Sequence, residues 1–438
     1  MKAFFSKTFD FNKKPNFITV LWFLVPFIAL IIEGLRGDAF INNYLIFKQV
    51  FWHTLHQENL YQLYPEQYVD KNHYGPLFAV LIAPFAILPN NLGLLLWGML
   101  NVSLLFYAVG KLPISFWGKN IILLISLIET LTSIQNLQFN PMLCSWIILS
   151  YVAIKNNYIS LAAFFIVAAT LIKIYGVVAL PFIFFTRDYK KLIGYLILWT
   201  IILFCLPMFI SSPEFIYQSY IDWFHVLLEK NTENVNSYLN ESMQDISVMG
   251  LVKRITGFHH LANFYFIIPA GILMLLPLYR FSKWGNSSFQ LTYLSQLLIG
   301  LVIFSTSAES PTYVIAVVGF SIWYVLHAPK PALHIYVLLI LVLIFTVFSP
   351  TDLFPKILQA IVVKFALKAL PCFLAWLLIS YNLLFNQFDN KGNSYTGLPG
   401  TGYGADLVPQ VGDIIMYNEG YYEVHEVIAN QYFVGKNP

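Results

Sequence analysis

The stretch FITVLWFLVPFIALIIEGLRGD, residues 17–38, decides the fold of this 438-residue chain. From Phe17 to Leu35 it is an almost unbroken apolar run, close to the roughly 20 residues that an α-helix needs to cross a hydrocarbon core about 30 Å thick. The run is longer than a signal-peptide core and has no small-residue cleavage site, so we expect an uncleaved first transmembrane helix. The lysines before it, Lys13 and Lys14 among them, predict a cytoplasmic N-terminus.

Apolar runs like this first one recur along the whole membrane part of the chain, and the overall composition reflects them. Hydrophobic residues make up 58% and charged residues 11% of the sequence, whereas roughly 25% of a soluble globular protein is charged, so a water-soluble globule is excluded. The apolar runs are continuous rather than alternating, which favours membrane helices over a β-barrel. The runs after the first lie at 76–89, 91–110, 120–135, 141–154, 158–185, 190–210, 261–279, 289–307, 311–328, 332–349 and 356–385. We therefore predict an all-α polytopic membrane protein with about 11 to 13 transmembrane helices.

Two long polar stretches, 36–75 and 211–260, interrupt the apolar runs. Orientation follows from the lysines and arginines between the runs, because cytoplasmic loops are enriched in them. If each run is one crossing, the basic residues at 187–191 lie on the cytoplasmic side with the N-terminus. Both polar stretches then lie outside, together with the turn 305–311.

Three lysines contradict that count, because they fall on the outer side. They are Lys111, Lys119 and Lys155. Several runs between 76 and 185 are short, and 158–185 is long and interrupted by glycine and proline. Half-helices or a re-entrant hairpin there would change the local parity, so the topology of 111–173 stays open.

The composition changes abruptly near Asn386. We predict a transmembrane domain at 1–385 and a polar, soluble tail at 386–438. The tail starts as a glycine-rich linker and then alternates around Asn418-Glu419-Gly420 like a small β-hairpin. We expect it to be β-rich or disordered.

The charge and the metal-binding residue types exclude several classes of partner. The net charge is only +3 and the basic residues are scattered, so we expect no nucleic-acid partner. The three cysteines lie inside apolar runs, at spacings that suit neither disulfides nor zinc. The histidines of the polar stretches lack clustered carboxylates, so we expect no metal and no cofactor.

Asp38 directly follows the first helix, at the depth of a lipid-linked substrate's head group. An ionisable residue at the membrane boundary points to function by default, although Asp38 and Arg36 are also compatible with a simple water interface. From Asp38 to Leu55, apolar and aromatic residues recur every three or four positions, which predicts an amphipathic interfacial helix. Long loops tend to be functional, which favours Asp38 as a site residue.

Short motifs follow one another along the membrane part. The first third contains Asp38–Tyr44, Asn59-Leu60-Tyr61, Tyr74-Gly75-Pro76-Leu77, Pro84, Leu88-Pro89, Trp97 and Asn101. Later come Leu137-Gln138-Phe139-Asn140, Ile172-Lys173-Ile174-Tyr175, Asn240-Glu241-Ser242-Met243 with Arg254, and Ser310-Pro311-Thr312-Tyr313. Each motif is weak alone, but in this order, over about 17–385, the chain resembles the family 87 glycosyltransferases. It departs from the family pattern at Leu137, where glycine is usual, and at Gly75 and Gly176, where proline is usual.

The resemblance implies a GT-C fold and an enzyme that uses polyprenyl-phosphate sugars, typically mannose. The acceptor is a hydroxyl of a lipid-linked or cell-envelope glycan, on the outer face of the cytoplasmic membrane. The resemblance assigns the general base to Asp38, since a carboxylate is ionised at neutral pH and can take the acceptor proton. One base and direct displacement imply inversion, unlike the paired carboxylates of many glycoside hydrolases. Glu33, Glu214 and Glu309 are the alternative carboxylates.

The leaving phosphate needs a positive partner, and fixed charge in a dry site stabilises a developing anion. The candidates are Lys173, alone in an apolar run, and Arg254. Snorkelling of Lys173 to the interface and anchoring by Arg254 with Lys253 are the alternative interpretations. Amides, hydroxyls and phenols suit sugar hydroxyls, although each is also common in caps and loops. The predicted sugar or acceptor ligands are Tyr74, Gln138, Asn140, Asn240, Ser242 and Tyr313.

Three other functions compete with this one. A transporter or flippase of lipid-linked saccharides predicts internal repeats and broken helices, and we see no convincing repeat. A polymerase or ligase of lipid-linked saccharides would have its largest outer loop late in the chain, rather than after the first helix. A purely structural membrane protein would not need the isolated Asp38 and Lys173, but composition alone does not exclude it.

Overall fold

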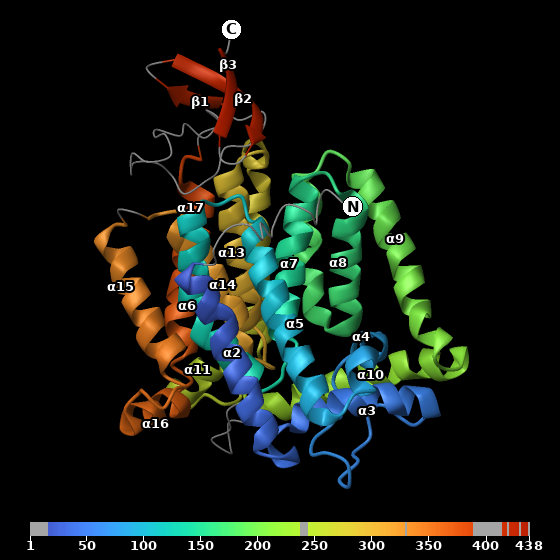
Figure 1. Ribbon diagram of the computed structural model, residues 1–438. Helices are drawn as coiled ribbons and strands as arrows, with labels where there is room; N and C mark the ends of the chain where they lie inside the picture. Colours follow the sequence, from blue (N-terminus) through green and yellow to red (C-terminus); the bar gives the residue numbers. More distant parts are fainter. Residues whose placement is uncertain are drawn as a thin grey trace.

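The computed structural model describes residues 16–236, 244–328 and 331–388 as a helical bundle, and three strands between 414 and 436 (Figure 1). Within these residues, four spans are long and apolar enough to cross a membrane: α2 (Phe17–Leu35), α5 (Asn90–Lys111), α6 (Phe116–Gln135), and α9 (Tyr189–Cys205) with η3 (Leu206–Phe209). A fifth is the pair α16 (Lys356–Lys364) and α17 (Ala369–Phe385), if their 60° bend belongs to one span. The predicted all-α polytopic membrane protein is confirmed.

Shorter helices complete the bundle. They are α7 (Asn140–Lys155), α8 (Ile159–Ile172), η2 (Ile174–Phe185), α12 (Phe264–Leu275), η5 (Leu276–Tyr279), η6 (Phe281–Lys283), α13 (Ser287–Ile303), η7 (Ser310–Thr312), α14 (Tyr313–Val325), α15 (Leu333–Leu341) and η8 (Val342–Phe348). Proline interrupts several apolar runs, because it lacks the backbone N–H and clashes with the preceding turn. Pro181 lies inside η2, and Pro277 starts the 3₁₀ turn that ends α12. The predicted 11 to 13 segments therefore include helices of 10–17 residues beside the full-length spans.

The two long polar stretches lie together at one end of the bundle, called here the polar end. Figure 1 shows α3, α10, α11 and α16 there, in the lower part of the view. The elements of the polar stretches and of the short run after the first are η1 (Asp38–Phe40), α3 (Asn42–His56), α4 (Phe78–Ala86), α10 (Pro213–Asn236) and α11 (Val248–Thr256). The interfacial helix predicted after Asp38 corresponds to η1 and α3, and α3 buries Tyr44, Phe47 and Val50.

The run at 76–89 does not cross the bundle, which corrects the crossing count. Its helix α4 has nine residues, and it is followed by Asn90, whose side chain donates to Asp38 Oδ1 at 3.3 Å. Residue 90 is therefore back at the end that residue 38 occupies. A nine-residue helix is about 14 Å long, roughly half of a hydrocarbon core.

The run at 158–185 makes two passes instead of one. Helix α8 descends to the polar end, Lys173 follows it as its C-cap, and η2 returns. The missing crossing at 76–89 and the extra one here offset each other. Helix α5 runs from Asn90 at the polar end to Lys111, α6 starts from the other end at Phe116, and α7 ends there at Lys155. Lys111, Lys119 and Lys155 consequently lie at the end opposite the polar stretches, where α9 also starts, and this resolves the contradiction within 111–173.

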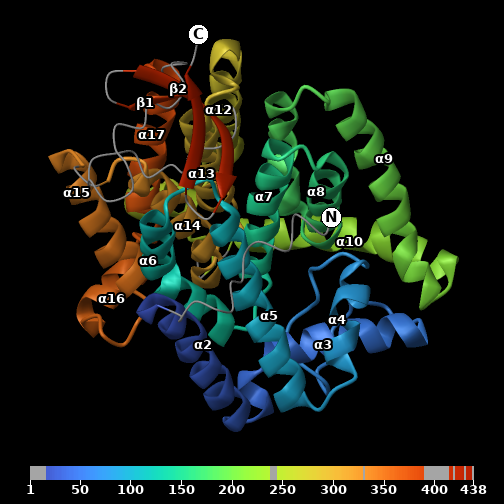
Figure 2. The ribbon, with the colours of Figure 1, turned by 45° about the horizontal axis from the view of Figure 1, so that its top comes forward.

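The core runs through α7, α13 and α14, whose residues are nearly all buried. Helix α9 contrasts with them, because only 17% of the residues in the apolar stretch of α9 and η3 are buried inside the protein. Figure 2 shows α9 at the outer edge of the bundle, next to α8. A helix that is apolar all round and so little buried has its outer surface in lipid.

The tail contains a small antiparallel sheet. Its strands are β1 (Ile414–Tyr417), β2 (Gly420–Ile428) and β3 (Gln431–Lys436), in the order β1-β2-β3. The predicted hairpin corresponds to β1 and β2, with Tyr417 paired to Gly420 across the turn. The membrane part ends with α17 at Phe385, next to the predicted boundary at 386.

Candidate functional site

The first polar stretch is fastened to α10. Asn59 donates to Asp222 at 3.2 Å, Lys71 pairs with Glu229 at 2.9 Å, and the Trp223 indole donates to the backbone carbonyl of His73 at 2.9 Å. The far end of α10 reaches the turn 305–311, where Asn234 donates to Ser307 at 3.0 Å. The two polar stretches and this turn, which were expected on the same side of the membrane, therefore form one polar assembly.

Lys173 lies inside this assembly, at the turn between α8 and η2. Its Nζ donates to Asn140 Oδ1 at 2.9 Å, and Asn140 begins α7. The ammonium also lies 4.9 Å from the ring centre of Tyr175 and 5.8 Å from that of Tyr74, where it interacts with the negative ring faces. Three predicted site residues, Lys173, Asn140 and Tyr74, thus meet in space from three separate motifs.

Gln138 and Glu309 join this cluster to the turn before α14. The Gln138 amide donates to Glu309 Oε2 at 3.1 Å and accepts from Asn140. Asn140 also donates to the Pro311 carbonyl at 3.2 Å. Glu309, considered from the sequence only as an alternative carboxylate, is thereby the carboxylate in hydrogen-bond contact with the cluster.

Two of the departures from the family pattern have structural explanations. Gly75 donates its N–H to the Ile172 carbonyl at 2.9 Å, which a proline cannot do, and a Cβ there would lie 2.0 Å from the Leu171 carbonyl oxygen. Leu137 has φ of +53°, the left-handed region that favours glycine. Its carbonyl accepts from the Trp97 indole at 3.0 Å, and this bond holds the turn in front of Gln138.

A cavity of about 390 Å³ opens beside Glu309, between α11, α16 and the turn 305–311. Arg254 lines it together with Lys368, Thr132, Asn136, Gln244, Ile246, Glu309, Ser310, Pro311, Ser349, Pro350, Gln359, Val362, Val363 and Ala366. Arg254 donates to the backbone carbonyls of Gln244 and Val363, at 2.7 and 3.2 Å. The two predicted phosphate-binding cations are therefore separate: Arg254 lines this cavity and Lys173 does not.

A buried ion pair underlies the cavity. Lys368 Nζ contacts Glu129 Oε1 at 2.8 Å and donates to Ser310 Oγ at 2.7 Å, and both charged side chains are almost fully buried. Sequence reasoning missed both residues. Glu129 lies in the apolar run 120–135 and Lys368 in 356–385, so the rule that singled out Lys173, an ionisable residue inside an apolar run, also identifies them.

Asp38 is exposed at the start of η1. Gly37, with φ of +95°, allows the chain to turn sharply out of α2 in front of it. Arg36 pairs with Glu33 at 2.9 Å, so the Asp38 carboxylate keeps only the 3.3 Å bond from Asn90 among the described residues. An exposed carboxylate with one weak partner is available to a substrate.

Asp38 belongs to the polar end but does not touch the Lys173 cluster. Its connection to the cavity runs through α3, where Asn43 donates to the backbone carbonyl of Asn136 at 2.8 Å. Asn136 lines the cavity.

His73 and Asp245 are among the ionisable groups of the polar end whose pKa values are shifted. Burial and the ammonium of Lys230 lower the pKa of His73 to about 4, partly opposed by Asp70. Burial raises the pKa of Asp245 to about 6, opposed by the hydrogen bond from Ser247.

The remaining predicted ligands differ in accessibility. Tyr313 is fully buried, and its hydroxyl donates to the Ile246 carbonyl at 2.7 Å, where it fastens α14 to the segment before α11. Asn240 and Ser242 lie outside the described residues. Lys253 donates to Asn263 at 2.7 Å. Among the described residues, no group of three His, Cys, Asp or Glu side chains has the arrangement of metal ligands.

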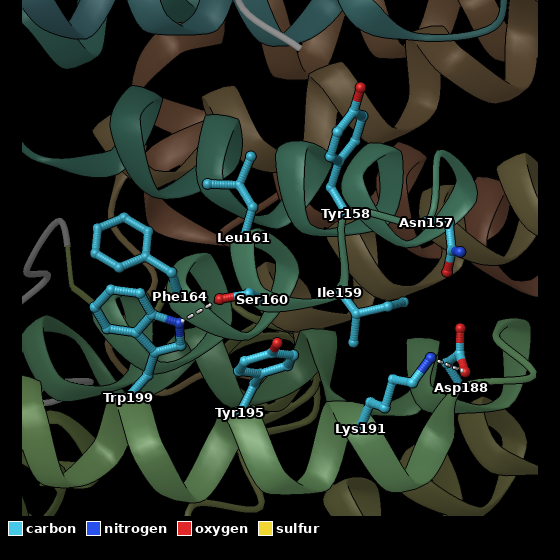
Figure 3. Close-up of a pocket in the computed structure, with 10 residues that line it drawn as sticks. All are labelled: Asn157, Tyr158, Ile159, Ser160, Leu161, Phe164, Asp188, Lys191, Tyr195 and Trp199. Atoms are coloured by element: carbon cyan, nitrogen blue, oxygen red, sulfur yellow. Dashed lines mark hydrogen bonds and ion pairs between the residues drawn. The ribbon is translucent and has the colours of Figure 1, made fainter. Parts of the chain in front are cut away.

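A larger groove, about 500 Å³, lies between α8 and α9 at the end opposite the polar end. Figure 3 shows its aromatic wall of Phe164, Tyr195 and Trp199, with the Lys191–Asp188 ion pair at one edge. No residue predicted to act in catalysis or binding lines it. The groove shares no lining residue with the cavity beside Glu309 and is separate from the candidate site.

The comparisons with known proteins agree with the motifs. The family model described as glycosyltransferase family 87 matches residues 72–350, more than half of the chain. No curated protein matches the sequence. Among solved structures, ArnT from Cupriavidus metallidurans bound to undecaprenyl phosphate is similar over 83% of this chain and 77% of that chain, with 12% identity and a TM-score of 0.35. That likeness is too weak to carry an argument, whereas the family match shows that this multi-pass membrane protein belongs to glycosyltransferase family 87.

Proposed function

We propose that this glycosyltransferase transfers a hexose, mannose in the first instance, from a polyprenyl-phosphate donor to a hydroxyl of a lipid-linked or cell-envelope glycan. The reaction takes place at the polar end, on the outer face of the cytoplasmic membrane. The observation that carries the proposal is the Lys173 cluster, where one ammonium is held by Asn140 between two tyrosine rings. A fixed cation in a site shielded from water suits a leaving group whose negative charge grows during transfer.

Each residue has a distinct role in this proposal. Asp38 takes the proton of the acceptor hydroxyl as that oxygen attacks the anomeric carbon, and a single displacement inverts the configuration. Lys173 stabilises the phosphate that leaves. Arg254, the other cation predicted for this role, lines a separate cavity and donates to two backbone carbonyls, so it is the alternative ligand of the phosphate. No second carboxylate is required for the displacement.

Gln138 is proposed to bind sugar hydroxyls, whereas Asn140, predicted for the same role, is fully buried with both amide atoms engaged and is proposed to orient Gln138. Gln138 and Asn140 are tied to each other, to Lys173 and to Glu309, so their orientation is set before a ligand arrives. Such preorganisation lowers the cost of ordering side chains on binding. Tyr74 stacks on Phe78 with ring centres 4.7 Å apart, and Tyr313, whose hydroxyl is engaged by Ile246, is proposed to position α14. Asn240 and Ser242 remain predictions.

The test is sugar transfer from radiolabelled polyprenyl-phosphate mannose by the full-length protein in nanodiscs. Asp38→Asn keeps the shape of the side chain but cannot take a proton, so we expect kcat to fall by about 10²- to 10⁴-fold. The matched control is Asp70→Asn, on the same polar stretch, where the carboxylate pairs with Lys230 at 4.0 Å.

Transfer by Asp38→Asn at the parental rate would overturn the assignment of the base. Movement of the lipid-linked sugar across the bilayer without any transfer would favour the transporter or flippase instead. Rates for Asp70→Asn close to those of the parent would show that the loss at Asp38 is not a general effect of removing an acidic charge from this stretch.

A further inference from the structure

The charged groups that line the cavity beside Glu309 are already held by the protein. The contacts are Arg254 to the carbonyls of Gln244 and Val363, Lys368 to Glu129, and Glu309 to the Gln138 amide. Glu129 neutralises Lys368, and the other two groups, Arg254 and Glu309, carry opposite charges, so the four groups together have no net charge. The cavity therefore suits an uncharged ligand with many hydroxyls better than a free anion.

Two amides that line the cavity have acceptor groups available to such a ligand. Gln359 Nε2 donates to the Ser349 carbonyl at 3.1 Å, and Asn136 Nδ2 donates to the Thr132 carbonyl at 2.9 Å. In the described part of the chain, the side-chain oxygens of Gln359 and Asn136 accept no hydrogen bond. Amide oxygens fixed in this way are matched to hydroxyl donors.

Helix α16 has two different faces. Gln359, Val362 and Val363 line the cavity, whereas Ile357 is 80% exposed and Ile361 is 42% exposed on the other side. An apolar face of this kind next to a membrane lies in the interface. An acceptor whose sugar occupies the cavity can thus keep its lipid chain along the outer face of α16.

The position of Asp38 distinguishes an acceptor from a donor. The base must lie near the acceptor hydroxyl, and Asn43, on the helix that follows Asp38, is bonded to Asn136 on the cavity wall. Lys173, which is proposed for the donor phosphate, lies on the other side of Glu309 and does not line the cavity.

We infer that this cavity binds the terminal uncharged sugar of a lipid-linked acceptor, with Gln359 and Asn136 as its specificity-determining residues. The inference rests on the proposed function for the identity of the reaction. The cavity volume, about 390 Å³, is in the usual range for small-molecule sites.

The experiment measures direct binding as well as transfer, with the full-length protein in nanodiscs. The probe for the acceptor is octyl α-mannoside below its micelle concentration, and the probe for the donor site is undecaprenyl phosphate. Gln359→Leu and Asn136→Leu each remove one hydrogen-bond acceptor, so we expect each to weaken octyl α-mannoside binding about fivefold and to raise its KM as an acceptor. Binding of undecaprenyl phosphate should stay at the parental value. Gln218→Leu is the control, on α10 outside the cavity, where the amide donates to Asp222 at 2.9 Å.

Unchanged octyl α-mannoside binding in both cavity variants would overturn the inference. So would weaker undecaprenyl phosphate binding with unchanged glycoside binding, because the cavity would then be an anion site. If glycoside binding falls but no donor supports transfer by the parent protein, the acceptor site stands and the proposed reaction fails. The two variants lie on different helices, so a folding defect in one leaves the other as a test.

Discussion

Two of the hollows of this protein differ in a way that size does not reveal. The groove between α8 and α9 is the larger, about 500 Å³, and its wall is mostly aromatic and aliphatic. The cavity at the polar end, about 390 Å³, brings together Arg254, Glu309 and Lys368. In a membrane protein, lipid chains can fill an apolar groove on an outer helix. Ionisable side chains inside the membrane region cost free energy, so a place where several of them meet indicates a function. The smaller cavity is therefore the better guide to chemistry.

The largest effect expected within this comparison separates Lys173, at the polar end, from Lys191, in the groove. We expect Lys173→Gln to lower kcat/KM for the polyprenyl-phosphate donor by about 10²- to 10³-fold, since it removes one fixed partner of the leaving group. Lys191→Gln, at the edge of the groove, breaks an exposed pair with Asp188 and should leave the rate within about twofold of the parent. Steady-state kinetics with varied donor measure both.

Equal losses at Lys173 and Lys191 would remove the distinction between the two ends. Normal donor kinetics for Lys173→Gln would return Lys173 to the role of a residue that snorkels to the interface, and Arg254 would be left as the proposed phosphate ligand.

An intermediate effect is expected from a single methyl group. Gly75→Ala places a Cβ 2.0 Å from the Leu171 carbonyl oxygen, so the loop that carries Tyr74 must move away from the turn that carries Lys173. Overpacking of this kind costs about 1 to 3 kcal/mol, and we expect about a tenfold fall in transfer with a lower thermal midpoint.

The control for Gly75 lies on the groove helix. Gly194→Ala in α9 meets no atom within 4 Å, so its expected cost is nil and its gain in helix propensity is up to about 1 kcal/mol. Similar losses for the two alanine variants would show that the contact between residue 75 and the α8–η2 turn does not govern the site.

The sequence was sufficient for the fold class, because continuous apolar runs leave a strong local signal. Lys173, Asn140 and Gln138 come from two separate motifs, and the structure joins them by hydrogen bonds. The crossing count failed at 76–89 for a physical reason. Hydropathy measures the length of an apolar run, but it does not record that a nine-residue helix turns back to the end from which it started.

The second feature that the sequence did not predict is which distant residues contact each other. Glu129 and Lys368 are 239 positions apart, and nothing local indicates that they form one ion pair. Gly75 and Leu137 show a similar limit. Each departs from the family pattern, yet the N–H bond of Gly75 to Ile172 and the Trp97 bond to Leu137 become visible only when distant segments are placed together.

The smallest expected effect is a pH dependence that arises from His73 at the polar end. In the folded protein the pKa of His73 is about 4, below its usual value of about 6.5, because of burial and the charge of Lys230. Between pH 6.5 and 4 the unfolded chain binds a proton that the folded chain does not, so the stability falls as the pH falls through this window. We expect His73→Gln to flatten the fall in thermal midpoint between pH 7 and pH 4.

Two further variants decide whether this pH dependence belongs to His73. Lys230→Gln removes the cation that lowers the pKa of His73 most, so this pKa should rise towards its usual value and the loss of stability on acidification should shrink. Trp199→Phe, in the groove, removes only the indole bond to Ser160 and no titratable group, so its midpoint should follow the parent at every pH. A His73→Gln protein that loses stability with acid as steeply as the parent would assign the effect to other groups. Because His73 and Lys230 lie at the polar end and Trp199 lies in the groove, the response of the thermal midpoint to acid should change in the first two variants and stay at that of the parent in the third.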